Sequence, residues 1–487
     1  MSIQFGTDGW RAVISDTFTY ANLRMVSQAI ADAVISPGWL SLSKLESVEN
    51  PNRVVVGYDT RFLSDRYAKE VSRILAANGL EVYLSQSAAP TPAISFAVKN
   101  FGAIGGVMIT ASHNAPRYNG VKIKAPYGGG ALPEQCKLVE MYMNDNEINM
   151  RGPNIMDFDQ AKSMNRIVMF NPVIDYSNHI RTLINFDVIA ESHDLRVIVD
   201  SMYGSGHGIM RNLLQGTGID VAEIRGEMNP GFGGIHPEPI NRNLGALASA
   251  IAAGMGNLGL ATDGDADRIG AMDERGTFID PHKILALAIR YLHQNRGLSG
   301  ALIRTVSTTR MVDCLGRNYG LEVFETPVGF NYISDHMLER DVLIGGEESG
   351  GISFKGHIPE GDGIIMGLLI TEMVAASGGT LGQLIEDLTN EIGAFYYDRT
   401  DIRLKRPVAK AEMIKFLTDN APAELNGEKV VEVSTKDGVK YILADDSWLL
   451  IRPSGTEPVL RVYSEGRSLE MVKELLAYGN SIADKVK

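Results

Sequence analysis

Three aspartates stand at alternate positions directly after an apolar run of the chain. The run covers residues 258–262 and is followed by DGDADR, which places carboxylates at Asp263, Asp265 and Asp267. Carboxylates this close repel one another unless a cation lies among them, and hard oxygen ligands suit Mg²⁺. The spacing predicts a magnesium site, with a solvated acidic turn as the alternative. A helix–loop–helix calcium site is disfavoured because its sixth position is Arg268 here rather than glycine.

A serine with a neighbouring histidine follows another apolar run. Residues 107–110 are followed by Ser112, His113 and a proline at position 116. The proline ends the strand pattern and leaves Ser112 on a loop. A hydroxyl beside an imidazole could be an activated nucleophile, and a turn held by local hydrogen bonds is the alternative.

Two further polar loops could bind a sugar phosphate. The segment 345–351, GGEESGG, carries carboxylates and a hydroxyl that suit sugar hydroxyls, and it lacks the lysine of a nucleotide-binding P-loop. The segment 452–458, RPSGTEP, offers a guanidinium, hydroxyls and backbone N–H groups that could form a phosphate cradle. A glycine-rich connection and a Pro/Gly turn are the respective alternatives.

The elements that position these loops are short apolar runs alternating with stretches of helical spacing. Strand-like runs are 54–57, 82–84, 107–110, 197–200, 258–262 and 342–345, and helical stretches include 67–78, 173–184, 282–294 and 364–376. This alternation predicts α/β units with mostly parallel sheets. After residue 395, two strand-like runs joined through Asp437 and Gly438 precede a closing helix, which predicts a separate α+β domain.

Length and composition limit the classes of protein that remain. A chain of 487 residues predicts roughly three or four domains. The net charge of −13 disfavours nucleic acid and anionic membranes as partners. Two distant cysteines argue against a disulfide scaffold. We find no signal or membrane-spanning segment and expect a cytoplasmic protein.

The polar motifs occur in one order along the chain: SHNAP at 112–116, DGDADR at 263–268, GEESG at 346–350 and RPSGTEP at 452–458. With FGTDGWR at 5–11 and GYDTR at 57–61, the chain resembles the α-D-phosphohexomutases, the phosphoglucomutase/phosphomannomutase superfamily, over nearly its whole length. The resemblance implies four domains around a central cleft, three related α/β domains with mixed or parallel sheets and a smaller C-terminal α+β domain. The expected ranges are 1–160 with the serine loop, 161–277 with the metal loop, 278–394 with the sugar loop and 395–487 with the phosphate loop.

The resemblance also implies roles for single residues. Ser112 would be carried as phosphoserine and would share Mg²⁺ with Asp263, Asp265 and Asp267. Around the transferring group would lie Arg11, His113, Lys122 and Arg268, with Lys122 or His113 moving protons. The sugar hydroxyls would be bound by Glu347 and Ser349, and the phosphate that is not transferred by Arg452, Ser454, Gly455 and Thr456. Positioning and charge neutralisation dominate phosphoryl transfer.

The chain departs from the family at one place. Some relatives have histidine where this chain has Gly351, and others have lysine where it has Gly361. The usual acid/base group of one half-reaction is therefore missing, and Lys355 and His357 are the candidates to replace it.

Four functions compete. The favoured one is synthesis of glucose 1,6-bisphosphate from a glucose monophosphate and a sugar bisphosphate donor such as fructose 1,6-bisphosphate. The alternative is a phosphoglucomutase/phosphomannomutase that interconverts hexose 1-phosphate and 6-phosphate. A catalytically silent binder of sugar phosphates is disfavoured by the intact Ser112 and aspartates, and a nucleotide-dependent kinase by the lack of a Walker-type loop. The expected partners are hexose phosphates and hexose bisphosphates.

Overall fold

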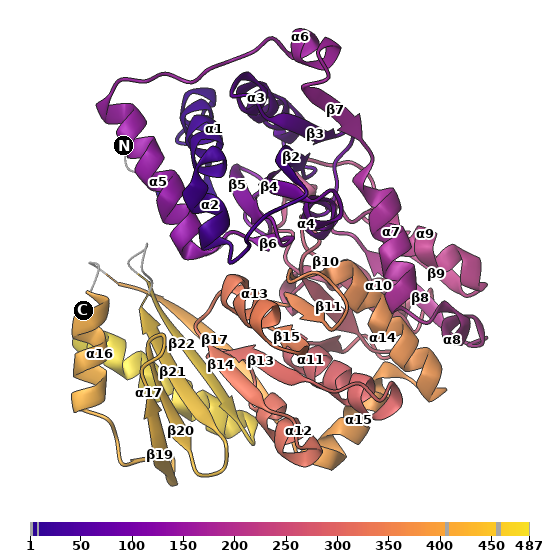
Figure 1. Cartoon of the computed structure of the whole chain (residues 1–487). Coiled ribbons are helices and arrows are strands. Elements are labelled where there is room, and N and C mark those ends of the chain that lie inside the picture. The colour runs from indigo at the N-terminus through magenta and orange to yellow at the C-terminus, as the bar shows by residue number, and fades with distance from the viewer. Residues whose placement is uncertain (1–2, 7–8, 405–408, 454–458, 487) are drawn as a thin grey trace.

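Four β-sheets, each with its own helices, follow one another along the chain (Figure 1). The structure is a computed structural model that describes residues 3–6, 9–404, 409–453 and 459–486. The first three sheets combine parallel and antiparallel strands with helices, and the fourth is antiparallel. This arrangement confirms the predicted fold class.

The first sheet has seven strands in the order β1-β5-β4-β2-β3-β7, with β6 paired to β5. Its strands are β1 Trp10–Val13, β2 Asn50–Tyr58, β3 Glu81–Ser85, β4 Ala103–Ile109, β5 Tyr118–Ala125, β6 Gly129–Gly130 and β7 Ile167–Phe170. Its helices are α1 Tyr20–Ile35, α2 Pro37–Leu42, α3 Ser64–Ala77, α4 Thr91–Asn100, α5 Pro133–Ile148 and α6 Phe158–Ser163. Because β7 pairs in parallel with β3, this sheet extends past residue 160, the end that we expected for the first domain.

The second and third sheets are smaller, with orders β12-β11-β10-β8-β9 and β14-β13-β15-β16. The strands are β8 Arg196–Asp200, β9 Asp220–Ile224, β10 Leu258–Thr262, β11 Ile269–Met272, β12 Phe278–Ile279, β13 Ala301–Thr305, β14 Val323–Thr326, β15 Val342–Gly346 and β16 Ile352–Phe354. The α-helices are α7 Pro172–Leu183, α8 Phe186–Ala190, α9 Ile209–Leu214, α10 Gly245–Ala252, α11 Pro281–Arg290, α12 Met311–Tyr319, α13 Phe330–Glu339, α14 Gly363–Ser377 and α15 Leu381–Ile392.

The three α/β sheets share one topology. In each, the first of four strands pairs in parallel with the second and with the third, and the fourth strand pairs antiparallel with the third. The four strands are β2, β3, β4 and β5 in the first sheet, β8, β9, β10 and β11 in the second, and β13, β14, β15 and β16 in the third. The reversal lies between β4 and β5, between β10 and β11, and between β15 and β16. These three reversals hold the serine, aspartate and sugar loops. The shared topology therefore places three polar loops at equivalent positions.

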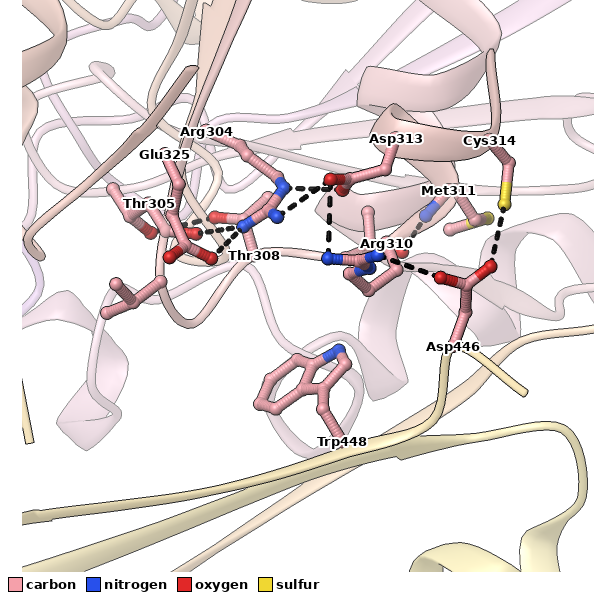
Figure 2. A network of polar contacts seen from close by, with 12 residues as sticks. Arg304, Thr305, Thr308, Arg310, Met311, Asp313, Cys314, Glu325, Asp446 and Trp448 are labelled. Carbon is pink, nitrogen blue, oxygen red and sulfur yellow. Dashed lines mark hydrogen bonds and ion pairs between the residues drawn. The ribbon is translucent and has the colours of Figure 1, made fainter. Parts of the chain in front are cut away.

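The C-terminal domain is an antiparallel sheet in the order β17-β22-β21-β20-β19-β18. Its elements are β17 Tyr396–Arg403, α16 Lys410–Asp419, β18 Glu424–Leu425, β19 Glu428–Ser434, β20 Val439–Leu443, β21 Trp448–Pro453, β22 Val459–Gly466 and α17 Leu469–Val486. A polar network joins it to the third domain (Figure 2). There Arg310 pairs with Asp446 (2.8 Å), and Lys440 Nζ donates to the carbonyl of Val306 (2.7 Å).

Helix α14 lies in the largest hydrophobic core cluster of the described residues. The side chain of Asp362 caps it by accepting from the N–H groups of Ile364 and Ile365, and residues 363–374 are buried. No single helix within the described ranges has the length and apolar composition to cross a membrane. Only α14 and α15 taken together do, and they are bent by 83° at the break between them.

Candidate active site

The aspartates of the loop 263–268 form one compact carboxylate group. One ligand oxygen from each of Asp263, Asp265 and Asp267 lies within 4.8 Å of the others. Burial and the charges of Asp267 and Asp265 hold the pKa of Asp263 well above its usual range. Oδ1 of Asp265 is buried without a hydrogen-bond partner among the described residues. Crowded, buried carboxylates with an oxygen left over are a donor set for a divalent cation, so these residues fit Mg²⁺.

The first and third domains hold this aspartate loop through its backbone. Thr91, at the start of α4, donates from its N–H to the Asp265 carbonyl (2.9 Å) and from its hydroxyl to Asp265 Oδ2 (2.6 Å). The N–H of Gly363 donates to the Ala266 carbonyl (3.0 Å). Position 363 requires glycine because a Cβ there would overlap the carbonyl of Arg268. The carboxylate group is therefore set by contacts between domains as well as by its own spacing.

Ser112 lies between β4 and β5 and faces the aspartate loop. Its hydroxyl donates to Asp263 Oδ2 (2.9 Å) and lies 3.4 Å from Nδ1 of His113. Burial and the charges of Arg268 and Arg11 hold the pKa of His113 well below its usual range, so this imidazole is neutral at neutral pH. The structure thus brings the serine and aspartate motifs, 151 residues apart, into direct contact.

A buried arginine that the sequence analysis did not single out holds the serine loop. Arg61 has no exposed side-chain surface, and its Nε lies 3.1 Å from Asp59 Oδ2. Its guanidinium donates to the backbone carbonyls of Ser112 (2.5 Å), Asn114 (2.7 Å), Ala115 (3.0 Å) and Tyr118 (3.1 Å). Only arginine presents so many donors in a fixed fork. This contact holds Ser112 in its left-handed conformation, with a φ of 50°. The signal in the sequence that could have pointed to Arg61 is GYDTR at 57–61, which the sequence analysis used only as evidence for the family resemblance.

The expected cations surround the two loops. Lys122 on β5 places Nζ 2.6 Å from Asp267 Oδ2 and 3.0 Å from Asp265 Oδ2. The Nε of Arg268 lies 4.0 Å from Asp263 Oδ2. Arg11 on β1 reaches the serine loop, where it donates to Asn114 Oδ1 (2.8 Å). Positive charge is therefore placed where a phosphoryl group on Ser112 would carry negative charge.

The sugar loop between β15 and β16 lies against the aspartate loop. The N–H of Ile269 donates to the carbonyl of Gly350 (3.2 Å). Glu347 Oε1 accepts from the N–H of Gly329 (2.8 Å), which orients this carboxylate. Ser349 is half-buried in the same loop. The three reversals of the α/β sheets thus meet at one place.

Gly351 and Gly361 lie side by side, but they differ in the space that each leaves for a Cβ. A Cβ at position 361 would lie 2.9 Å from the Asp267 carbonyl oxygen and 3.0 Å from Cα of Gly351, so the backbone approach excludes a side chain. A Cβ at position 351 would meet Phe330 at 3.4 Å and Glu347 Oε2 at 3.9 Å, which are ordinary contacts. Position 351 therefore has room for a Cβ and position 361 does not.

The two candidates for the missing acid/base group are held elsewhere. Lys355 is partly exposed and pairs with Asp341 (2.6 Å). His357 has no exposed side-chain surface and places Nε2 2.8 Å from Asp362 Oδ2. Each therefore already has a carboxylate partner, and the expectation that one of them replaces the family's acid/base group stays a prediction.

The C-terminal domain presents Arg452 at the end of β21. Its Nε lies 2.7 Å from Asp437 Oδ2, which also accepts from the N–H of Val328 (3.2 Å) in the third domain. Arg461 stands directly opposite Arg452 on β22, and its buried Nε has no hydrogen-bond partner among the described residues. The sequence analysis missed Arg461, although strand alternation after the loop was a signal. The remaining predicted phosphate ligands, Ser454, Gly455 and Thr456, lie outside the described residues.

Comparison with known proteins matches the whole domain series. Models of the phosphoglucomutase/phosphomannomutase α/β/α domains I, II and III match residues 2–150, 174–276 and 280–392, and that of the C-terminal domain matches 408–478. A phosphoglucomutase/phosphomannomutase of Thermococcus kodakarensis is 32% identical over 485 residues, 99% of this chain and 98% of that protein. A probable phosphoglucosamine mutase of Pyrococcus abyssi is 30% identical over 98% of this chain and 96% of that protein. The crystal structure of a candidate phosphomannomutase from Thermus thermophilus superimposes with a TM-score of 0.82 at 33% identity, covering 99% of each chain.

Three α/β domains followed by a C-terminal domain are the architecture of a phosphohexomutase, an enzyme that transfers phosphoryl groups. Such enzymes depend on Mg²⁺, which the aspartate group fits. The chain belongs to the phosphoglucomutase/phosphomannomutase family.

Proposed function

We propose that this enzyme interconverts hexose 1-phosphates and hexose 6-phosphates through a phosphoryl group carried on Ser112. The observation that carries the proposal is the 2.9 Å contact between the Ser112 hydroxyl and Asp263, inside the carboxylate group. Mg²⁺ bound by Asp263, Asp265 and Asp267 would neutralise the phosphoryl oxygens. The names of the relatives include phosphoglucomutase/phosphomannomutase and phosphoglucosamine mutase. Hexose phosphates are therefore the proposed substrate class, with glucose phosphates first.

The transfer would take two half-reactions. In the first, the bond from phosphorus to Ser112 Oγ breaks as a bond to a hydroxyl of the bound monophosphate forms, and the hydroxyl proton passes to Ser112 Oγ, relayed by Lys122 or by the neutral His113. In the second, the hexose 1,6-bisphosphate turns, the bond from its other phosphorus to the sugar oxygen breaks as a bond to Ser112 Oγ forms, and the serine proton passes to that sugar oxygen. The remaining proposed contacts are charge from Arg11 and Arg268 and hydrogen bonding from the neutral His113 at the reacting group, Glu347 and Ser349 at the sugar, and Arg452, Ser454, Gly455 and Thr456 at the distal phosphate.

Synthesis of glucose 1,6-bisphosphate is the second candidate. The sequence analysis ranked it above the mutase, but the comparisons favour the mutase. The observation in its favour is the pair Gly351 and Gly361, together with the engagement of Lys355 and His357 elsewhere. A half-reaction without a positioned acid or base loses about 10²–10⁴-fold in rate. A slow half-reaction would leave the bisphosphate longer in a cleft from which it can escape.

Product analysis decides between the two. The enzyme is incubated with glucose 1-phosphate or glucose 6-phosphate, a trace of glucose 1,6-bisphosphate and, in a parallel series, excess fructose 1,6-bisphosphate. Anion-exchange chromatography follows every sugar phosphate with time. The mutase proposal expects the two monophosphates to interconvert at constant bisphosphate. Net accumulation of glucose 1,6-bisphosphate, matched by loss of fructose 1,6-bisphosphate and faster than isomerisation, would replace it by the synthase.

The Gly351→His variant tests the cause of any bisphosphate release. Position 351 accepts a Cβ at ordinary contact distances, with Glu347 Oε2 at 3.9 Å, so the variant introduces an imidazole beside this carboxylate. If a missing acid or base limits one half-reaction, the variant is expected to release less bisphosphate per monophosphate converted, by roughly tenfold or more. A lysine at position 361 is a poor probe because its Cβ would displace the backbone of the aspartate loop. An unchanged ratio in a folded Gly351→His enzyme would remove this explanation.

Arg452→Ala is expected to lower kcat/KM for every hexose phosphate by about tenfold or more, since a charge-assisted hydrogen bond is worth about 1.5–3 kcal/mol. Phosphorylation of Ser112 by a bisphosphate should still be detectable by intact-mass analysis. Lys410→Met is the matched control, because Lys410 is the other cation on Asp437, at 2.7 Å. Equal kcat/KM values for Arg452→Ala and the unaltered enzyme would exclude Arg452 from phosphate binding.

A further inference from the structure

A buried polar cluster beside the aspartate loop has no part in the proposed transfer. It consists of Tyr176 and His179 on α7, His357 in the turn after β16, and Asp362 at the start of α14. Helix α7 follows β7 and leads from the first domain into the second (Figure 1). The side chains of His357 and Asp362 have no exposed surface. Burying such groups is costly unless they are fully hydrogen-bonded.

The carboxylate of Asp362 takes part in four hydrogen bonds. Oδ1 accepts from the N–H groups of Ile364 (2.9 Å) and Ile365 (3.0 Å), in the first turn of α14. Oδ2 accepts from the Tyr176 hydroxyl (2.7 Å) and lies 2.8 Å from Nε2 of His357. A helix cap requires only the first pair of bonds. The second pair fixes the direction of the carboxylate, and with it the first turn of α14.

A second histidine extends this network to the first domain. Nδ1 of His357 lies 3.1 Å from Nε2 of His179. The ring of His179 stacks on Phe96 of α4, with centroids 4.7 Å apart. Burial and the neighbouring His357 lower the pKa of His179 to about 4, so one nitrogen of the pair can accept a hydrogen bond at neutral pH. The position of Asp362 is therefore set by α4, α7 and the turn after β16.

The residues that flank Asp362 touch the backbone of the aspartate loop. On one side, Gly361 lies so close to the Asp267 carbonyl that a Cβ would be 2.9 Å from it. On the other side, the N–H of Gly363 donates to the Ala266 carbonyl (3.0 Å). A tilt of the first turn of α14 would thus move the backbone that carries Asp265 and Asp267.

We propose that Asp362, oriented by Tyr176 and His357, is a positioning residue that sets the backbone of the aspartate loop for Mg²⁺. The inference rests on the proposed metal site and adds its support from outside the loop. Groups that orient metal ligands without touching the metal are typically worth about 10–100-fold in metal affinity. We therefore expect the metal affinity of the protein to depend on a side chain that is fully buried.

The test is calorimetric titration of the full-length protein with Mg²⁺ alone, without substrate, together with thermal unfolding. Asp362→Asn and His357→Gln are expected to bind Mg²⁺ at least about tenfold more weakly, with Tyr176→Phe showing a smaller loss. Asp280→Asn is the matched control, since Asp280 caps α11 and pairs with Lys283 (2.8 Å). This variant loses the ion pair with Lys283 but keeps a good N-cap, since asparagine caps about as well as aspartate, and it should leave Mg²⁺ affinity unchanged.

The outcomes separate a positioning role from a structural one. Unchanged Mg²⁺ affinity in folded Asp362→Asn would reduce Asp362 to a helix cap and overturn the inference. If that variant does not fold, unchanged affinity in both His357→Gln and Tyr176→Phe would overturn it equally. If the unaltered protein does not bind Mg²⁺, the proposed metal site and this inference both fail. If the unaltered protein and the variants bind Mg²⁺ equally well, the metal site stands and only this inference fails.

Discussion

Ser112→Ala is expected to reduce phosphoryl transfer by roughly 10⁴-fold or more, the scale on which loss of a covalent nucleophile is felt. The hydroxyl lies 2.9 Å from Asp263, in a loop that Arg61 holds through four carbonyls. Alanine removes the acceptor of the phosphoryl group and leaves that loop otherwise unchanged. Coupled assays with glucose 1-phosphate would measure the loss, and intact-mass analysis would show whether the variant still takes up a phosphoryl group.

Two observations would decide whether the serine is the carrier. Peptide mapping of the active enzyme should place one phosphoryl group on Ser112. Ser85→Ala is the control, because Ser85 is a buried serine at the end of β3 whose hydroxyl donates to the carbonyl of Ser87. Near-normal turnover in Ser112→Ala, or a phosphoryl group on another residue, would exclude the covalent mechanism.

Removal of the metal ligands is expected to have a comparable effect. Asp265→Asn should lower activity by more than about 100-fold, since even partners outside the coordination sphere are worth about 10–100-fold. Asp265 is buried and has one oxygen without a hydrogen-bond partner among the described residues, and a phosphoryl group on Ser112 would add about −1.5 to −2 charge beside it. Exhaustive chelation should stop the unaltered enzyme and added Mg²⁺ should restore it.

A stability measurement makes this test independent of turnover. A ligand that binds only the folded state stabilises it by about 2.7 kcal/mol at a concentration of about 100 times its Kd. Mg²⁺ should therefore raise Tm in the unaltered protein and in Asp273→Asn, whose carboxylate caps the turn after β11, and fail to do so in Asp265→Asn. Full activity after chelation, or an equal Tm rise in Asp265→Asn, would contradict magnesium binding at the aspartate loop.

The loops and their chemistry could be recognised from the sequence because each is a local pattern. An apolar run followed by DGDADR predicts both a buried strand and a crowded group of carboxylates from a few consecutive residues. The α/β class followed from the alternation of strand and helix patterns for the same reason, and the family followed from the order of four motifs. Which strands pair with one another is harder to predict from the sequence, as β7 illustrates. Its partner β3 lies more than 80 residues earlier, so no local signal assigns it to the first sheet.

Only the tertiary structure decided which side chains meet at these loops. Arg61 holds the carbonyls of the serine loop from 51 residues away, and Thr91 reaches Asp265 across 174 residues. His357 was a candidate acid/base by its place in the sequence, yet it faces Asp362 and His179. The glycine at position 361 is required by the approach of the Asp267 carbonyl, a contact that its neighbours in sequence do not reveal. Such contacts depend on how whole domains pack against one another. The free energy of that packing comes from many residues far apart in the sequence, so no single segment predicts it.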